Sequence, residues 1–581
     1  MRKASLSIAS CVIIIFALVA YRFSPPKYNK DTPLIVTNWD ALGYYFYLPS
    51  IFIYHDTKEL KWFPEMDKKY SLSGGWLYQA SKLKNGNYVF QYFGGVAILE
   101  GPFFFIANSM ARKLGYPADG FSPPYQFAVT FGVIFYNILA LFLFRKVLLK
   151  YYDDYVTSIT LLLVMLATNV IQYISIDNAM SHGFILPLYI LVLYFTIKWH
   201  ENPKISTASI IGAIIGLATI CRPTEAIMLL IPLLWNTQNK IASKEKWRLV
   251  KKNKTHLYML LVFGFIAVLP QLIYWKIATG SFVFDVGSSW RFLTPFFRVL
   301  IGWEKGWFIY TPVTIFFIIG MFYIKNYSFK NSVIYFCLLN IWIIIAWADW
   351  RYGASYSCRA LSQSYPVFAL PLAAFINQIR NKKFGFIIYP VGLYLIFVNL
   401  FQLVQYNKCI LHYDEMNRKY YFSIYLNPNP SSFDMGMMDN DERLYSEKKY
   451  SNQLLLDSQL TERIQMPEYS NKVIYESEIG NKENVLRSKC NWLKIESRIK
   501  VNSSNLWGCY ICSQLKLKDS IKLNRIRIMN PNCIKGQFND YGFYVKIPPY
   551  FNKSHFKLFI YSSSTLDYDI EEISVKYLTI K

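Results

Sequence analysis

An acidic residue opens an aromatic, uncharged stretch near the N-terminus of the chain. Asp40 begins the segment "DALGYYFYLPSIFIY", and His55 and Asp56 follow its end. Aromatic side chains favour the headgroup level of a bilayer, and a short helix of this composition lies in the interface plane. One interpretation is that Asn38 or Asp40 simply caps this helix. The other is that Asp40 is a base held at a membrane surface.

Further residues that could take part in catalysis or binding lie in short polar segments between apolar runs, namely "SIDNAMSH", "CRPTEA", "GWEKGW" and "DWRYGASYSCRAL". An arginine at a helix end can merely snorkel, or it can grip a phosphate with two parallel donors. Our candidates for binding a donor phosphate are Arg222, Lys305, Arg351 and Arg359. Our candidates for lining a substrate pocket are Tyr44, Tyr45, His55, Asp56, Asp177, His182 and Glu225.

One acid and several cations beside a membrane suit a particular reaction, the transfer of a sugar from a polyprenyl phosphate. The leaving phosphate is weakly basic, so it needs positive charge and no general acid. The attacking hydroxyl or amine needs one general base. A glycoside hydrolase, in contrast, usually needs two carboxylates. The residue types therefore favour an inverting glycosyltransferase with Asp40 as its base.

The composition indicates a polytopic membrane protein with a soluble part. The chain has 581 residues, of which 53% are hydrophobic and 17% charged, and its mean hydropathy is +0.20. The formal net charge is +25. Much of this excess lies in short loops, where the positive-inside rule accounts for it, so we expect no nucleic-acid partner. The N-terminus has a basic start and one apolar run without a small-residue cleavage site, which predicts a retained first helix with the N-terminus inside.

The topology depends on whether the apolar segment 93–111 crosses the membrane. If it does not, the loops placed inside carry seventeen Lys and Arg residues, and those placed outside from residue 177 onward carry six. This bias follows the positive-inside rule. We therefore expect segment 93–111 to re-enter or lie in the interface, and about eleven helices to span. Residues 24–124 then form one outer loop with interfacial helices, and all the polar segments named above lie outside the cytoplasmic membrane.

The C-terminal third has a different pattern. From about residue 485 it shows short alternating segments broken by Asn, Pro, Gly and Ser, which predict an antiparallel β-sandwich. We therefore expect a polytopic α-helical membrane domain over residues 1–406, a polar connector over 407–484 and an extracytoplasmic all-β sandwich over 485–581.

The segments "WDALGYYFYLPSIFIYHD", "YFGGVAILEGPFFFIA", "DNAMSHGF", "CRPTEAI" and "WRYGASYSCRAL" resemble the C-type glycosyltransferase superfamily over about residues 30–405. The chain is similar to uncharacterised multi-pass membrane proteins of Bacteroidetes, and more distantly to protein O-mannosyltransferases and aminoarabinose transferases. The resemblance implies that the first-loop acid, here Asp40, is the base or a metal-binding acid. Many members carry two adjacent acids there, whereas Ala41 follows Asp40 here. No cofactor is therefore certain, and a divalent metal stays open, with His55 and Asp56 farther along either replacing the second acid or only ending the helix.

The resemblance also implies the partners: a polyprenyl-phosphate-linked sugar, the lipid bilayer, and a glycan, lipid or protein acceptor in the cell envelope. Two other functions stay open at this point. A transporter or flippase for lipid-linked glycans would need polar residues at mid-bilayer in broken helices, and charges within the apolar runs are scarce. A non-catalytic scaffold with the sandwich as a binding module would not need Asp40 at all.

Overall fold

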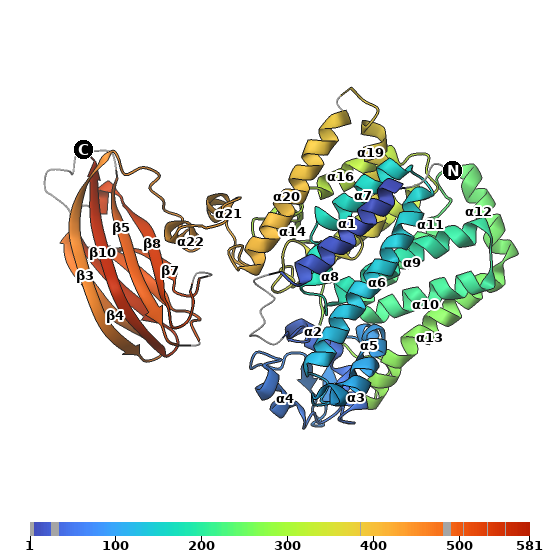
Figure 1. Cartoon of the computed structure of the whole chain (residues 1–581), viewed down its shortest axis with the longest axis horizontal. Coiled ribbons are helices and arrows are strands. Elements are labelled where there is room, and N and C mark those ends of the chain that lie inside the picture. Colours follow the sequence, from blue (N-terminus) through green and yellow to red (C-terminus); the bar gives the residue numbers. More distant parts are fainter. Residues whose placement is uncertain are drawn as a thin grey trace. The chain divides into compact units, whose positions relative to one another are not determined.

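The structure, a computed structural model, describes residues 5–24, 34–383, 385–479, 490–503, 505–530, 533–551 and 553–580, without the side chains of 460–462. The expected boundary between residues 484 and 485 lies outside these residues. The chain divides into two compact units, Met1–Leu403 and Val404–Lys581, which we describe separately (Figure 1).

The first unit is mainly helical. Its first segment holds the helices α1 (Ser5–Arg22), α2 (Trp39–Tyr45), α3 (Tyr47–Phe52), α4 (Phe63–Tyr70) and α5 (Gly95–Ala111) and the hairpin of β1 (Ala80–Lys82) and β2 (Tyr88–Phe90). There follow η1 (Arg112–Leu114), α6 (Pro123–Leu149), α7 (Asp154–Leu166), α8 (Val170–Ser175), α9 (Ser181–Glu201), α10 (Ile205–Cys221), η2 (Pro223–Leu229), α11 (Leu230–Leu234), α12 (Lys240–Lys252) and α13 (Lys254–Thr279).

The remaining elements of this unit are α14 (Arg298–Ile301), α15 (Trp307–Tyr310), α16 (Thr314–Gly320), η3 (Met321–Tyr323), α17 (Lys330–Ala346), α18 (Arg359–Ser362), α19 (Tyr365–Ile379), η4 (Gly385–Ile387) and α20 (Ile388–Asn407), whose last turn belongs to the second unit. Within the described part of the chain, five helical segments are long and apolar enough to cross a membrane, and six more are shorter and apolar. The prediction of a polytopic helical membrane protein is confirmed.

Two neighbouring helices of this bundle, α10 and α13, approach each other at backbone distance. A Cβ atom on Gly212 would lie 1.9 Å from the carbonyl oxygen of Leu260, and one on Gly216 would lie 2.2 Å from that of Gly264. Small residues at such positions let membrane helices pack closely. This contact fixes α10, whose C-terminal end at Cys221 leads directly into Arg222.

Helix α5 packs with the interfacial helices as part of one hydrophobic core. The hydroxyl groups of Tyr45 and Tyr54 donate to the carbonyl oxygens of Gly120 and Asp119, which follow α5 in the chain. The Tyr47 hydroxyl donates to the carbonyl oxygen of Tyr92, a residue that precedes α5 in the chain. The segments on both sides of α5 thus contact the region of the short helices α2 and α3. If α5 crossed about 30 Å of hydrocarbon, these two segments would lie on opposite sides of the membrane. This arrangement favours the prediction that α5 does not span.

The strands of the second unit form a β-sandwich (Figure 1). In its described residues two antiparallel four-stranded sheets have the strand orders β3-β10-β5-β8 and β4-β9-β6-β7. The strands are β3 (Tyr450–Met466), β4 (Ser470–Ile479), β5 (Asn491–Val501), β6 (Tyr510–Leu517), β7 (Ser520–Arg527), β8 (Phe538–Ile547), β9 (Ser554–Ser562) and β10 (Leu566–Ile580), with η6 (Pro549–Phe551) before β9. This order is that of a jelly roll. An all-β C-terminal sandwich is therefore confirmed.

The expected start of the sandwich at residue 485 is wrong, because β3 and β4 fall in the stretch interpreted as a connector. Both are edge strands, and most of their described residues are exposed or half-buried. Edge strands carry polar and charged side chains that discourage further pairing. The alternation that reveals a half-buried strand is therefore weak in "YSNQLLLDSQLTERIQM".

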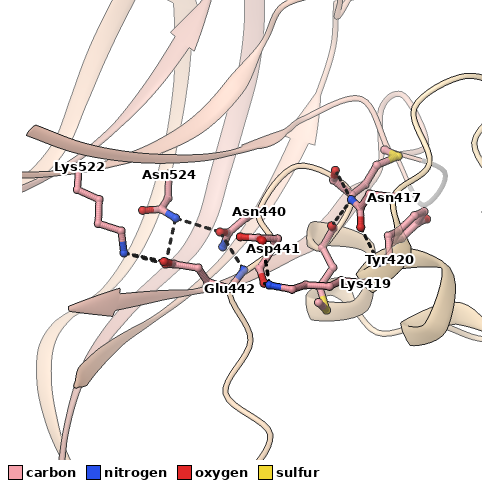
Figure 2. Close-up of polar contacts among 10 residues, drawn as sticks. Asn417, Lys419, Tyr420, Asn440, Asp441, Glu442, Lys522 and Asn524 are labelled. Carbon is pink, nitrogen blue, oxygen red and sulfur yellow. Dashed lines mark hydrogen bonds and ion pairs between the residues drawn. The ribbon is translucent and has the colours of Figure 1, made fainter. Parts of the chain in front are cut away.

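The rest of the expected connector is folded onto the sandwich. It contains α21 (Arg418–Ile424) and α22 (Ser432–Gly436). Figure 2 shows how the segment after α22 joins the edge strand β7: the Asn524 side chain donates to Asn440 at 3.0 Å, and the Lys522 ammonium lies 2.8 Å from the Glu442 carboxylate. Asn440 also donates to the carbonyl oxygen of Tyr544 in β8. These bonds cover two sheet edges that would otherwise expose backbone groups.

We predict that both flanks of α5 are reached from the same side of the membrane. Single cysteines replacing the exposed Lys84 and Lys113, in a background without Cys409, Cys490 and Cys533, should react with a membrane-impermeant maleimide in the same vesicle orientation.

A cysteine replacing Lys251 in α12 is the matched control and should react only in the opposite orientation, because the basic loop is expected inside. Labelling of positions 84 and 113 from opposite sides would show that α5 crosses.

Candidate functional site

Asp40 lies in the first turn of α2, and its side chain points to other elements rather than to the helix. Asn38 precedes the helix without a side-chain cap, so the capping interpretation does not describe this helix. Trp39 has φ near 50°, a left-handed conformation that is strained for a bulky residue. Its backbone is fixed by hydrogen bonds with Leu72 and the Gln79 side chain. This bend aims the carboxylate away from its own helix.

A β-hairpin supplies two hydrogen bonds to this carboxylate. Strands β1 and β2 pair with Ala80 opposite Phe90. Continuing this register by two residues places Tyr78 opposite Tyr92, and the bond from the Gln91 amide to the Gln79 carbonyl keeps the register between them. The hydroxyl groups of both tyrosines donate to Oδ1 of Asp40 at 2.8 Å. Two residues distant in sequence thereby act as one clamp.

The Tyr92 ring reaches Asp40 because it crosses α2 at a glycine. A Cβ atom on Gly43 would lie 2.1 Å from the Tyr92 ring. Tyr44 packs edge-on against the same ring, with centroids 4.8 Å apart. Since residues i, i+3 and i+4 share a helix face, Asp40, Gly43 and Tyr44 together form one wall of the site.

The other wall carries Arg359, whose guanidinium donates to Oδ2 of Asp40 at 2.6 Å. The side chains are only 12% and 24% exposed, for Arg359 and Asp40 respectively. Burial alone would raise the pKa of the Asp40 carboxyl, but the charge of Arg359 and the hydrogen bonds of this arginine and the two tyrosines outweigh it. The net pKa lies below its usual range, and Asp40 is anionic at neutral pH.

Lys305 fixes the loop that delivers Arg359. Its ammonium is 1% exposed and donates to the carbonyl oxygens of Gly353 and Ser355 and to the Ser355 hydroxyl. An ammonium has three N–H groups, and the loop occupies all three. The structure therefore disagrees with our expectation that Lys305 binds phosphate, because its donors are used to hold the loop before α18.

The turn from Arg359 to Gln363 links this ion pair to a buried polar chain. Gln363, one helical turn after Arg359, donates to Oε1 of Glu225 at 2.6 Å. Its amide oxygen meets Nδ1 of His182. The Tyr189 hydroxyl donates to the other oxygen of Glu225. The predicted residues His182 and Glu225 are thus brought together, through a glutamine that sequence reasoning missed.

Arg222 precedes Glu225 by three residues, at the start of η2. Its side chain is half-buried, and its charge acts on Tyr44 and His182, as that of Arg359 does, and also on Glu225. Among the described residues we find no hydrogen bond or ion pair made by its guanidinium. The N–H donors of Arg222 are therefore available to an anion.

Other predicted site residues lie elsewhere. His55 is exposed, and Asp56 accepts hydrogen bonds from the backbone N–H groups of Lys58, Glu59 and Lys61. Both follow α3, at the far end of the helix pair from Asp40, so they do not supply a second acid beside it. The expectation that they line the pocket disagrees with this placement.

Three further candidates have local roles. Tyr45 is fully buried between Phe104 and Phe121, because it follows Tyr44 by one residue and so lies about 100° around the axis of α2 from it. Asp177 accepts from the Gln172 side chain. Arg351 is exposed, with its guanidinium over the Trp350 ring.

Sequence reasoning missed Tyr78, Tyr92 and Gln363. A signal existed for the two tyrosines: "SKLKNGNYVF" carries an Asn-Gly turn between short strands, which is a strong hairpin pattern. As for a metal, no group of three His, Cys, Asp or Glu side chains suited to hold one was found in the described ranges.

One segment of the chain matches a known protein family. Residues 125–275 match the family described as dolichyl-phosphate-mannose-protein mannosyltransferase, a segment that includes His182, Arg222 and Glu225. This match confirms the resemblance to C-type glycosyltransferases. A comparison with curated proteins found no match.

Three solved structures resemble parts of the chain. The oligosaccharyltransferase of Archaeoglobus fulgidus, tethered with an acceptor peptide, is 11% identical over 73% of this chain and 57% of its own, with a TM-score of 0.42. The arabinosyltransferase EmbB of Mycobacterium smegmatis is 8% identical over 98% and 64%, with a TM-score of 0.38. A chain in the structure of infectious bursal disease virus, Gx strain, is 11% identical over 23% of this chain and 32% of its own, with a TM-score of 0.17. The chain spans less than two thirds of each of these solved chains, and similarities at this level do not define its activity.

We predict that Arg359→Gln raises the pKa of the Asp40 carboxyl. The substitution removes the positive charge and leaves the burial, which disfavours the anion. The infrared band of the Asp40 carboxyl is titrated in difference spectra, in which each protein is compared with the same protein carrying Asp40→Asn. The Asp40 carboxyl should become protonated at a higher pH in Arg359→Gln than in the wild-type protein.

Arg351→Gln is the matched control, since this exposed arginine should leave the midpoint in place. An unchanged or lower midpoint in Arg359→Gln would contradict the electrostatic account of the pair.

Proposed function

We propose that the protein is an inverting glycosyltransferase that moves a hexose or pentose from a polyprenyl-phosphate donor to a glycan, lipid or protein of the cell envelope. The reaction takes place on the outer face of the cytoplasmic membrane, with the N-terminus inside and the sandwich outside. Asp40 is the general base, and Arg222 holds the donor phosphate. The name of the matched family, which contains a dolichyl-phosphate-linked mannose, supports a lipid-phosphate donor.

The observation that carries this proposal is an anionic Asp40 with one acceptor position left, together with Arg222, whose guanidinium makes no ion pair among the described residues. Oδ1 accepts from two tyrosines and Oδ2 accepts from Arg359. Because each carboxylate oxygen has two lone pairs, Oδ2 can accept one more hydrogen bond, from an acceptor hydroxyl. The partial exposure of the side chain leaves room for such an approach.

The proposed step balances with these groups alone. The acceptor oxygen forms a bond to the anomeric carbon, and the bond from this carbon to the phosphate oxygen breaks. The acceptor proton passes to Oδ2 of Asp40 and then to water. The electron pair of the broken bond stays on the phosphate, whose added charge is stabilised by Arg222 and the remaining N–H groups of Arg359. Inversion follows from a single displacement.

A weakly basic carboxylate is adequate for this step. The pKa of Asp40 is low because of its three donors, so the residue stays in its base form over the physiological range. If the bond from the anomeric carbon to the phosphate breaks before the bond to the acceptor oxygen forms, the acceptor hydroxyl becomes acidic only late in the reaction. A fixed carboxylate at the right position is then a sufficient base. Positioning by Tyr78, Tyr92 and Arg359 is therefore worth more than a higher pKa.

We predict that Asp40→Asn lowers the transfer rate by about 10²–10⁴-fold, the range that general bases contribute, while the protein stays folded in the membrane. The measurement is mass spectrometry of envelope glycans from cells with wild-type protein, with the variant and with neither, together with thermal unfolding of the purified protein.

Asp56→Asn is the matched control, an acid of the same loop that holds a turn, and should keep transfer near the wild-type level. Retained transfer in Asp40→Asn would exclude Asp40 as the base. Glycans that are identical with and without the wild-type protein would exclude the enzyme.

We predict that Arg222→Ala weakens inhibition by the product, a short-chain polyprenyl phosphate, by about 10–100-fold. Hydrogen bonds to a charged group contribute roughly 1.5–3 kcal/mol, and 1.4 kcal/mol corresponds to a factor of ten. Inhibition constants are measured in the transfer assay with added lipid phosphate.

Arg351→Ala should leave the inhibition constant unchanged, because this arginine lies on Trp350. An equal loss in both variants would indicate a diffuse electrostatic effect rather than a phosphate site at Arg222.

A further inference from the structure

The polar chain behind the ion pair fixes the protonation of His182. Three donors converge on the Glu225 carboxylate, from Tyr189, Gln363 and Thr224, so this group acts as an acceptor. Gln363 must then turn its NH₂ group to Glu225 and its oxygen to His182. An amide oxygen only accepts, so Nδ1 of His182 carries the hydrogen that joins them.

The other ring nitrogen of His182 is consequently a lone pair. A neutral imidazole with hydrogen on Nδ1 has an acceptor at Nε2. His182 is 2% exposed, and burial of the ring disfavours its charged form. The part of the chain that the structure describes offers Nε2 no hydrogen-bond partner.

His182 is one of two nearby residues with unsatisfied polar groups. Both amide atoms of Asn178 and Nε2 of His182 are buried, and none of these atoms has a hydrogen-bond partner within the described residues. Such groups are rare in folded proteins, and each costs free energy unless something else bonds to it. Their concentration in residues 178–182, at the start of α9 and beside Arg222, indicates a place that a polar ligand completes.

We infer that Nε2 of His182 accepts a hydrogen bond from a hydroxyl group of the donor sugar, and that His182 thereby selects the sugar. This inference rests on the proposed function. A phosphate oxygen would face a lone pair at Nε2, whereas a hydroxyl presents the hydrogen that this atom lacks. The sugar is the hydroxyl-bearing group covalently attached to the phosphate at Arg222, so it is the part of the donor next to His182.

Gln363, Glu225 and Tyr189 are positioning residues in this arrangement. They do not touch the sugar, and they act by keeping the hydrogen of His182 on Nδ1. Because Gln363 and Arg359 share one helical turn, the element that positions Asp40 also positions His182, the residue that binds the sugar. Selection and catalysis are thus coupled through α18.

The first arm of the test needs no substrate. Full-length protein with ¹⁵N-labelled histidine is placed in lipid nanodiscs, and the ring nitrogen shifts report the tautomer of each of its six histidines. We expect a neutral Nδ1–H signal that disappears in His182→Gln and changes to Nε2–H or a mixture in Gln363→Leu. His200→Gln, at the other end of α9, is the matched control and should leave that signal in place. A His182 that is Nε2–H or doubly protonated at neutral pH would overturn the inference.

The second arm measures selectivity. For the donor identified by the glycan comparison, analogues lacking one hydroxyl at a time are compared in the transfer assay. Wild-type protein should prefer the complete donor over one of these analogues by about 10–100-fold in kcat/KM, the effect of leaving one buried acceptor unpaired. In His182→Phe and Gln363→Leu this preference should fall to within a few-fold, whereas a merely structural role would lower both rates equally.

The outcomes separate the two proposals. If wild-type protein transfers sugar but both variants keep every preference, the role of His182 is refuted and the proposed function stands. If wild-type protein transfers no sugar from any donor, the proposed function fails and the sugar assignment fails with it, while the tautomer measurement still decides whether the polar chain fixes His182.

Discussion

The site depends on one ion pair between side chains 319 residues apart in sequence, Asp40 and Arg359. Both charges are largely withdrawn from water, and removing one partner of a buried pair costs roughly 3–5 kcal/mol because the other charge is left uncompensated. Such a pair persists only when its remaining hydrogen-bonding positions are filled. The hairpin tyrosines do this for Asp40, and the loop held by Lys305 brings Arg359 to meet it.

These supports also decide what the two charges can do. Asp40 keeps a single acceptor position, so one group can be bound there and deprotonated. Arg359 donates to that carboxylate, and in the proposed mechanism Arg222 is the principal donor to the phosphate. The division of labour differs from the one expected from residue types, in which four cations shared the phosphate. It follows from geometry: two cations are consumed in building the site, and Arg351 is placed on a tryptophan.

The sequence predicted the features that depend on local pattern and composition. The apolar helical segments, the short helices α2 and α3 and the strands β5 to β10 all follow from hydrophobic length and periodicity. The acid at the start of the aromatic stretch was singled out because its type and its neighbours are unusual. The hairpin that carries the tyrosine clamp was also accessible from its Asn-Gly turn, whereas the register that pairs Tyr78 with Tyr92 is known only from the structure.

The remaining features depend on contacts between distant residues, which no local pattern records. Nothing near Lys305 indicates that a loop some fifty positions later would occupy its ammonium. Tyr44 and Tyr45 look alike in sequence, and only the packing of α2 shows which one faces the site. The edge strands β3 and β4 were missed because their surroundings require the polar residues that hide the strand pattern.

We propose that Asp40 and Arg222 act on one lipid-linked sugar. The decisive measurement is an experimental structure of the protein in a lipid nanodisc with a non-transferable polyprenyl-phosphate sugar bound. We expect phosphate oxygens within hydrogen-bonding distance of Arg222 and the anomeric carbon facing Oδ2 of Asp40. A lipid phosphate bound away from both residues, with the Asp40–Arg359 pair unchanged and facing no ligand, would contradict it.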